Sequence, residues 1–171
     1  MKKILIPFII LSLIPIALSA SIFGKTGTAS LQFLKLGVDA RAIGMGEAYT
    51  AVTDDVSSLY WNPAGISKKF GDQIMFSHTK WPAEISQEFV GYTTETDYGM
   101  LGFQASLLHM DDMDVTEENN FGPTGEKFTA SNVAVGLTYG QAFTDKFSFG
   151  FTAKYIREDI WEENINSFSV D

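Results

Sequence analysis

The sequence predicts an all-β fold, an antiparallel transmembrane β-barrel preceded by a plug of irregular structure and short helices. Three observations lead to this prediction. Apolar residues recur at every second position in long stretches after residue 72, which is the period of a strand. The positions between them carry small neutral residues, whereas a water-facing sheet surface carries charged and polar ones. Before residue 72 there is neither a strand period nor a long helical period, and the chain opens on an export signal.

The first 20 residues have the anatomy of a secretory signal peptide. Lys2 and Lys3 supply the positive charge, residues 4–18 are apolar apart from one serine, and small residues follow. The apolar run is too short for a membrane helix, which takes about 20 residues. We therefore expect cleavage after Ser19 or Ala20 and a location in the cell outer membrane.

Composition narrows the classes of partner. The chain has 171 residues, no cysteine and a formal net charge of −9; loss of Lys2 and Lys3 leaves 10 basic and 21 acidic residues, or −11. This acidic balance offers no basic patch for phosphates, so no nucleic acid is expected as a partner. The absence of cysteine fits an oxidising compartment.

Residues 21–71 form the expected plug. A short helix is expected over residues 29–36, and a compact irregular stretch over residues 37–66. The first half of that stretch is rich in alanine and glycine, including Gly44 and Gly46. Small side chains let one backbone pass close to another, so we expect tight packing here.

The second half of the stretch reads as two short helical turns. Asp54 or Asp55 is placed to cap the first turn, and Asn62 to cap the second. Pro63 then takes the first helical position, where its missing N–H costs nothing, and Gly65 permits an early stop.

Arg41 is the basic residue of this stretch. We expect it to pair with Asp54 or Asp55, because a charge held inside a plugged barrel needs an opposite charge.

An ordered set of plug residues resembles the PorV/PorQ family of outer-membrane proteins. The set consists of Arg41, Gly44-Met45-Gly46, Asp54-Asp55 and Trp61-Asn62-Pro63-Ala64-Gly65. That family is similar to the FadL-type barrels, whose N-terminal hatch carries a similar Asn-Pro-Ala step. The resemblance runs from about residue 28 to the end of the chain, and it implies a plugged outer-membrane barrel.

Residues 72–171 carry the strands. The clear strands are expected at 98–110, 131–143 and 147–157, a weaker one at 89–96, a first one carrying Ile74 and Phe76 on one face, and a last one beginning with Phe168 and Val170. Five strands and the start of a sixth cannot close a sheet in lipid, where each unpaired backbone group costs several kcal/mol. We therefore expect the chain to be the first part of a larger barrel.

Two soluble folds alternate in the same way, a secreted β-sandwich and a lipocalin-like barrel. The clear strands reach the 9–11 residues that a membrane strand needs, against a mean of about 5–6 in soluble proteins. Lys154 falls on the plug side, whereas on the lipid side at mid-membrane it would cost roughly 2–4 kcal/mol. Both observations favour the membrane barrel.

Turn lengths are expected to alternate. Tight turns are expected at residues 96–97 and 144–146, and long loops at 80–88, 111–129 and 158–166. Membrane barrels have short periplasmic turns and long external loops, so the plug should start from the periplasmic side. Aromatic residues near strand ends suit a membrane girdle: Trp81, Tyr98, Tyr139, Phe143, Tyr155 and Trp161.

Candidate chemistry is sparse, and we expect no enzyme, no cofactor and no metal site. An acidic loop holds Asp111, Asp112, Asp114, Glu117 and Glu118. Calcium would suit such carboxylates, but the spacing does not fit an EF-hand, and a solvated acidic loop is favoured. His78 and His109 share the lipid-facing parity, while Ser77 and Ser106 have the opposite one, which argues against a hydrolase.

Two functions from different classes remain open. The FadL resemblance implies transport of a hydrophobic small-molecule ligand through a plugged lumen, in contact with outer-membrane lipid. The PorV resemblance implies instead a scaffold of type IX secretion that holds secretion-system proteins through its external loops. Few large apolar residues lie on the inward parity, so the sequence favours transport only through its plug.

Overall fold

A computed structural model describes residues 30–68, 71–116, 122–161 and 163–171. The expected signal peptide, the start of the plug and two carboxylates of the acidic loop, Glu117 and Glu118, lie outside these ranges. Among the described residues, no helix combines the length and the apolar character that crossing a bilayer requires.

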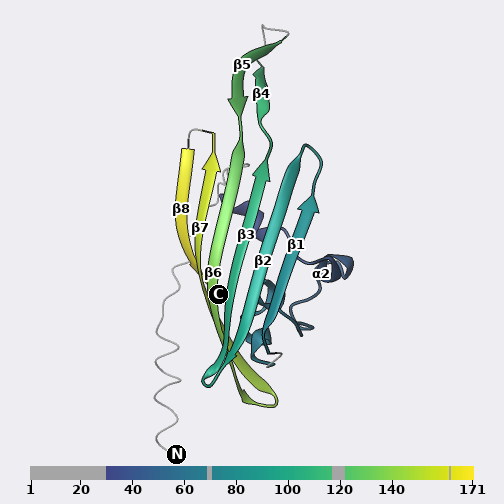
Figure 1. The fold of residues 1–171 in the computed structure, drawn as a ribbon, viewed down its shortest axis with the longest axis vertical. Coiled ribbons are helices and arrows are strands. Elements are labelled where there is room, and N and C mark those ends of the chain that lie inside the picture. The colour runs from purple at the N-terminus through teal and green to yellow at the C-terminus, as the bar shows by residue number, and fades with distance from the viewer. Residues whose placement is uncertain (1–29, 69–70, 117–121, 162) are drawn as a thin grey trace, which may run out of the picture.

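Six strands form one antiparallel sheet in the order β1-β2-β3-β6-β7-β8 (Figure 1). Their bounds are β1 Gln73–Lys80, β2 Ile85–Thr96, β3 Gly99–Met110, β6 Ala130–Thr144, β7 Phe147–Ile160 and β8 Glu163–Val170. A separate two-stranded hairpin, β4 Met113–Thr116 with β5 Pro123–Phe128, projects beyond the sheet between β3 and β6. The fold is therefore all-β and antiparallel, and within the described ranges the sheet is open, with β1 and β8 as its edges.

The predicted strands are present, but several are longer than predicted. β2 begins at Ile85 instead of residue 89, β7 continues to Ile160, and β8 begins at Glu163 instead of near Phe168. The long loops predicted at 80–88 and 158–166 are therefore wrong. Residues 81–84 alone join β1 to β2, and β8 begins at Glu163, soon after β7 ends at Ile160. The loop at 111–129 is largely the β4–β5 hairpin. The tight turns at the other end of the sheet are confirmed.

In the described residues before the sheet there are four short helical elements: η1 Gln32–Lys35, α2 Ala40–Gly44, α3 Ser58–Trp61 and η2 Pro63–Lys68. The helix predicted at 29–36 is a single 3₁₀ turn, η1. This N-terminal segment covers one face of the sheet, which we call the covered face, and leaves the other, the open face, without it (Figure 1). The described part of this segment begins beside Glu158, at the β7–β8 edge of the sheet. It ends with η2, which packs against β6 and β7.

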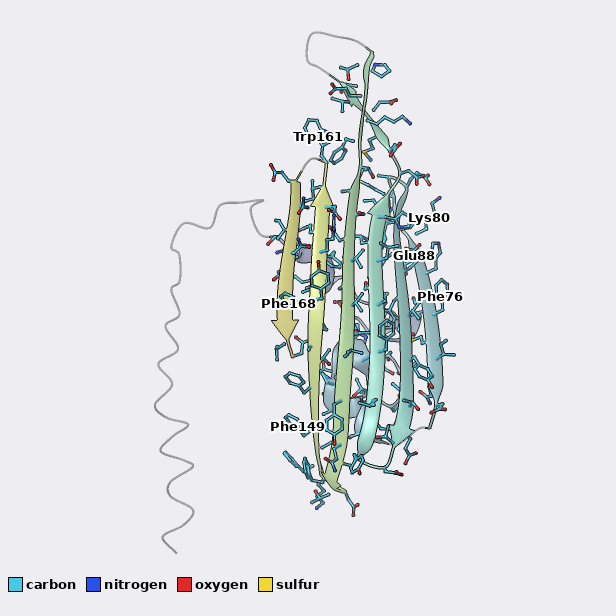
Figure 2. All side chains as sticks on the ribbon, turned by 60° about the vertical axis from the view of Figure 1, so that its left-hand side comes forward. Phe76, Lys80, Glu88, Phe149, Trp161 and Phe168 are labelled. Carbon is cyan, nitrogen blue, oxygen red and sulfur yellow. The ribbon has the colours of Figure 1, made fainter. Side chains whose placement is uncertain are left out.

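The two faces differ in composition as predicted. The covered face carries small and neutral polar residues, among them Gly91, Gly102, Gln104, Gly136, Thr138, Gly140, Gly150 and Thr152, with Lys154 also on this side. The open face carries Ile74, Phe76, Tyr92, Leu101, Phe103, Leu137, Phe149, Phe151, Tyr155, Phe168 and Val170, all exposed. Even Leu137, on the interior strand β6, is 65% exposed. Figure 2 shows Phe76 and Phe168 along the sheet, with Lys80 and Glu88 closer to its upper end.

The core lies between the covered face and the N-terminal segment. One apolar cluster joins Val56, Leu59 and Ile66 to Met100, and a second joins Phe33 to Ala134 and Ile156. Glycines of the sheet make this contact close. A Cβ at Gly102 would overlap Leu59, and one at Gly140 would lie 2.6 Å from Ile66 Cγ1. The small residues of the covered face therefore make room for α3 and η2.

Candidate functional site

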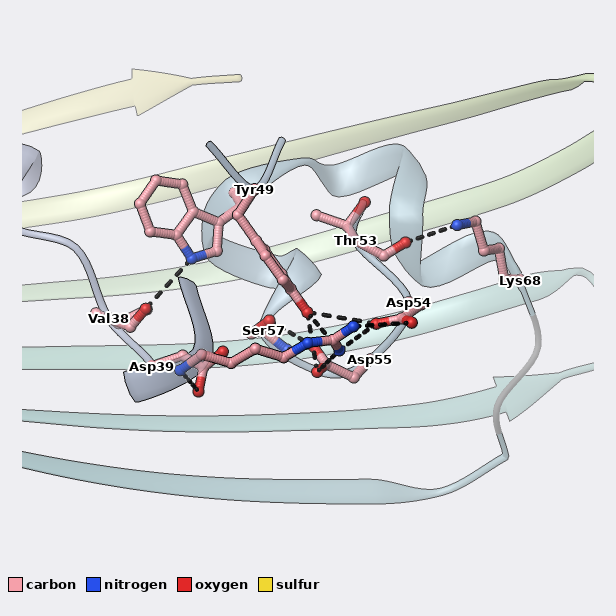
Figure 3. Close-up of polar contacts among 10 residues, drawn as sticks. Val38, Asp39, Tyr49, Thr53, Asp54, Asp55, Ser57 and Lys68 are labelled. Carbon is pink, nitrogen blue, oxygen red and sulfur yellow. Dashed lines mark hydrogen bonds and ion pairs between the residues drawn. The ribbon is translucent and has the colours of Figure 1, made fainter. Parts of the chain in front are cut away.

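A polar cluster in the N-terminal segment includes Tyr49, Asp54 and Asp55 (Figure 3). Arg41 is its centre. Its Nη1 donates to Asp54 Oδ1 at 2.6 Å and to the Tyr49 hydroxyl at 3.0 Å, and it lies 3.5 Å from Asp55 Oδ2. The predicted pairing of Arg41 with Asp54 is therefore present. Asp55 has a second role, because its Oδ1 accepts from the Ser57 backbone N–H at 2.9 Å and caps the turn that leads into α3, as predicted.

Tyr49 completes this cluster, and sequence reasoning missed it. Its side chain is fully buried, and its hydroxyl lies 3.3 Å from Asp54 Oδ1 and 3.1 Å from Asp55 Oδ2. Its ring also lies under the Arg41 guanidinium, at 5.3 Å from the ring centre. The sequence does single out this residue, because Tyr49 is the sole aromatic residue among the small residues of positions 37–52.

The charges in this cluster set its dependence on pH. The hydrogen bond from Arg41 holds the pKa of Asp54 below its ordinary value of 3.8, and the same contact raises the pKa of Arg41. Burial raises the pKa of Tyr49. A carboxylate whose pKa is lower in the folded state than in the unfolded state stabilises the fold at any pH above its unfolded-state pKa. This stabilisation is lost as the pH falls through the folded-state pKa. The cluster should therefore be intact at neutral and mildly acidic pH.

Protection of residues 39–57 should stay constant from pH 7 to pH 5 and should fall only below pH 3.8. Hydrogen exchange followed by mass spectrometry measures this, after correction for the intrinsic exchange rate at each pH. Arg41→Ala should lower protection at pH 7 and at pH 5, because it removes the cation that pairs with ionised Asp54. Arg157→Ala is the control, since it breaks an equally exposed pair with Asp159 on the open face. A fall in the protection of the unmodified protein between pH 7 and pH 5, or unchanged protection in Arg41→Ala at pH 7, would contradict this assignment.

Asn62 joins the two halves of the N-terminal segment. Its Oδ1 accepts from the Ala64 backbone N–H at 3.1 Å, which is the predicted cap, and Pro63 is the first residue of η2. Its Nδ2 donates to the Thr50 carbonyl at 3.0 Å, a contact that the sequence did not reveal. Lys68 makes a second tie, because its Nζ donates to the Thr53 carbonyl at 2.7 Å.

Asn62→Ala should lower the stability of the N-terminal segment by about 1 kcal/mol, because the cap and the tie to Thr50 are both lost. Asn62→Asp should retain most of the stability, since it keeps the capping oxygen. Protease sensitivity at Arg41 and Lys68, together with the melting temperature, measures the change. Asn164→Ala, at an exposed position of β8, is the matched control. An Asn62→Ala protein with unchanged melting temperature and cleavage would show that the cap does not matter.

The three glycines of the predicted motif differ in what the structure requires of them. Gly65 does not stop the helix as predicted, because η2 continues to Lys68. A Cβ at Gly65 would instead overlap Thr53 Oγ1 and lie 2.8 Å from Ser58 Oγ, so Gly65 permits close packing. Gly46 adopts a φ of +64°, which favours glycine. The close approach predicted for Gly44 is wrong, because a Cβ there would have no described atom within 4 Å.

A cavity of about 440 Å³ lies between the N-terminal segment and the covered face. Leu34, Tyr60 and Trp61 line it from the segment, and Gln104, Lys154 and Asp171 from the strands. Gln104 Nε2 is committed to the Leu59 carbonyl at 2.8 Å. The Tyr60 hydroxyl lies 2.8 Å from the carbonyl oxygens of both Leu34 and Leu36, and burial raises its pKa to about 12. The cavity therefore has room for a small molecule between the Tyr60 and Trp61 rings and the small residues Ser106, Ala134 and Gly136.

The other sequence candidates lie away from this cavity. His78 and His109 are on the open face, opposite to Ser77 and Ser106, as predicted, and both face Glu88, at 3.0 and 3.3 Å. Asp112 pairs with Lys127 at 3.4 Å across the β4–β5 hairpin. Among the described residues, no three histidine or acidic side chains are arranged to hold a metal ion. No family model, curated protein or solved structure matches the chain.

Proposed function

We propose that this protein is a non-enzymatic outer-membrane β-barrel whose N-terminal segment plugs the lumen and controls the passage of hydrophobic solutes. The contrast between the two faces of the sheet carries the proposal. The open face presents a continuous apolar surface formed by every strand of the sheet. Exposed apolar surfaces of this extent mark contact with a membrane or a partner. The covered face is small and polar and holds the segment, as a plugged lumen requires.

The dimensions of the strands support a membrane location. β2, β3, β6 and β7 have 12, 12, 15 and 14 residues, and a membrane strand needs about 9–11. Along β7 the apolar positions of the open face run from Phe147 to Tyr155, roughly 27 Å at about 3.4 Å per residue. The apolar band of membrane barrels is about 25 Å tall, which is comparable. Arg157 and Asp159 follow directly beyond that band.

Aromatic residues flank the apolar surface. Tyr98, Phe143 and Phe147 are exposed at the end with the tight turns, and Trp81 and Trp161 at the other end. Figure 2 shows Trp161 near the upper end of the sheet. Such belts suit the two interfaces of a membrane. With the plug motif that resembles the PorV/PorQ and FadL-type proteins, this supports a transport barrel.

The whole protein should fractionate with the outer membrane and should require detergent for extraction. The reason is the open face, which water would contact unfavourably. Immunoblots of separated outer-membrane, inner-membrane and periplasmic fractions measure this. The mature protein in the outer-membrane fraction should begin at Ala20 or Ser21. A periplasmic protein that contains no β-barrel serves as the fractionation control. Recovery of the folded protein in the soluble periplasm would overturn the membrane assignment.

A scaffold of type IX secretion is the second candidate, and the β4–β5 hairpin favours it. The hairpin extends beyond the sheet and could contact a secreted partner without touching the plug (Figure 1). Deleting residues 112–128 separates the two functions. Under the transport proposal, uptake of a labelled long-chain lipid should persist in the deletion strain. Loss of a co-purifying secreted protein, with no lipid uptake by the intact barrel, would replace transport by the scaffold function.

A further inference from the structure

The cavity beneath the N-terminal segment contains an ion pair. Lys154 Nζ bonds to Asp171 Oδ2, and the Lys154 side chain is 14% exposed. The ammonium also lies 6.0 Å from the centre of the Tyr60 ring, on the opposite wall. Both charges therefore face the space that a solute would enter, and each already has its partner.

The position of this pair is fixed by the sheet. Lys154 is on β7 opposite Ser169, and Asp171 follows β8 with its backbone bonded both ways to Thr152, at 3.0 Å each. The stem of Lys154 lies against the neighbouring Gly136, where an added Cβ would be 3.1 Å from Lys154 Cγ. The lysine is thus directed along the floor of the cavity, and the carboxylate meets it there.

We propose that the Lys154–Asp171 pair makes the cavity selective for uncharged hydrophobic molecules that carry a hydroxyl, ester or ketone oxygen, and unfavourable for free carboxylates. This inference rests on the proposed transport function and names its substrate class. An ammonium has three donors, so Lys154 can donate to a neutral oxygen while it stays bonded to Asp171. A ligand carboxylate would compete with Asp171 for the same cation and would lie beside a like charge. Tyr60 and Trp61 supply apolar surface for the rest of the molecule.

Two probes with the same alkyl chain test this selectivity, dodecan-1-ol and dodecanoate, both radiolabelled. Equilibrium dialysis against the whole protein in micelles at pH 8 gives the affinity for each. Binding to the Ser106→Trp variant is subtracted as background, because Ser106 lines the cavity and tryptophan should fill it. Ala105→Trp is the matched control, since the adjacent side chain points to the open face. We expect the alcohol to bind at least ten-fold more tightly than the carboxylate.

Asp171→Asn should abolish the preference. It leaves Lys154 without its anionic partner, so dodecanoate affinity should rise at least ten-fold while dodecan-1-ol affinity stays within about two-fold. Lys154→Met should weaken the binding of both probes to a similar level. Tighter binding of dodecanoate than of dodecan-1-ol by the unmodified protein, or an unchanged ratio in Asp171→Asn, would overturn the proposal. So would binding of both probes unaffected by Ser106→Trp, and so would the absence of binding. The transport proposal would survive each of these results if lipid uptake by the intact barrel persisted.

Discussion

A single methyl group added at Gly150 should displace the N-terminal segment from the sheet. A Cβ at this position would overlap the backbone of Pro63 and Ala64 at the start of η2. Backbone atoms cannot rotate away as a flexible side chain can, so either the strand or η2 must move. Overpacking of this kind costs typically 1–3 kcal/mol, and we expect Gly150→Ala to lie at the upper end, about 3 kcal/mol.

Gly136→Ala is the matched control for this prediction. Gly136 lies on the covered face of the neighbouring strand, but its added Cβ would meet the side chains of Gln104 and Lys154, at 3.0 and 3.1 Å. These side chains can adjust. Trypsin should therefore cleave at Lys68 and Arg41 much faster in Gly150→Ala than in Gly136→Ala, while strand content by circular dichroism stays the same. Equal cleavage in the two variants would show that the close approach at Gly150 does not hold η2.

Deletion of residues 37–66 should raise the conductance of the whole barrel by the largest factor of any change considered. In the intact protein, α3 and η2 occupy the covered face through Leu59 and Ile66, so the proposed lumen is blocked. Without them, that face would present many glycine, threonine and other small residues to the lumen, together with longer side chains such as Gln104 and Lys154. Single-channel recording in planar bilayers should show low conductance before deletion and at least ten-fold more after it.

Two further variants make the conductance result specific. Deletion of residues 112–128, in the hairpin outside the sheet, should leave conductance unchanged. Arg41→Ala should give a small or intermittent increase, because it loosens residues 39–57 while η2 remains packed on β6 and β7. If the 37–66 deletion inserts as a stable barrel and conducts no better than the intact protein, the segment is not a plug.

The features that the sequence predicted correctly are set by residues that lie close together in the chain. The period of two placed Ile74 and Phe76 on one face and Lys154 on the other, because alternate residues of a strand point to opposite faces. The cap by Asn62 follows from neighbours two positions away. The pairing of Arg41 with Asp54 needed only opposite charges within one compact stretch. Each of these features depends on residues close in the chain.

The tertiary structure decided the features that depend on distant partners. Gln87 and Glu158 look like loop residues because they are polar, yet both lie on strands and are buried on the covered face. Gln87 Nε2 donates to the Leu36 carbonyl at 3.2 Å, and Glu158 Oε2 accepts from the Leu31 N–H at 3.0 Å. These partners lie 51 and 127 residues away in the chain. A buried polar group is stable when it is hydrogen-bonded, and only the folded chain brings its partner to it.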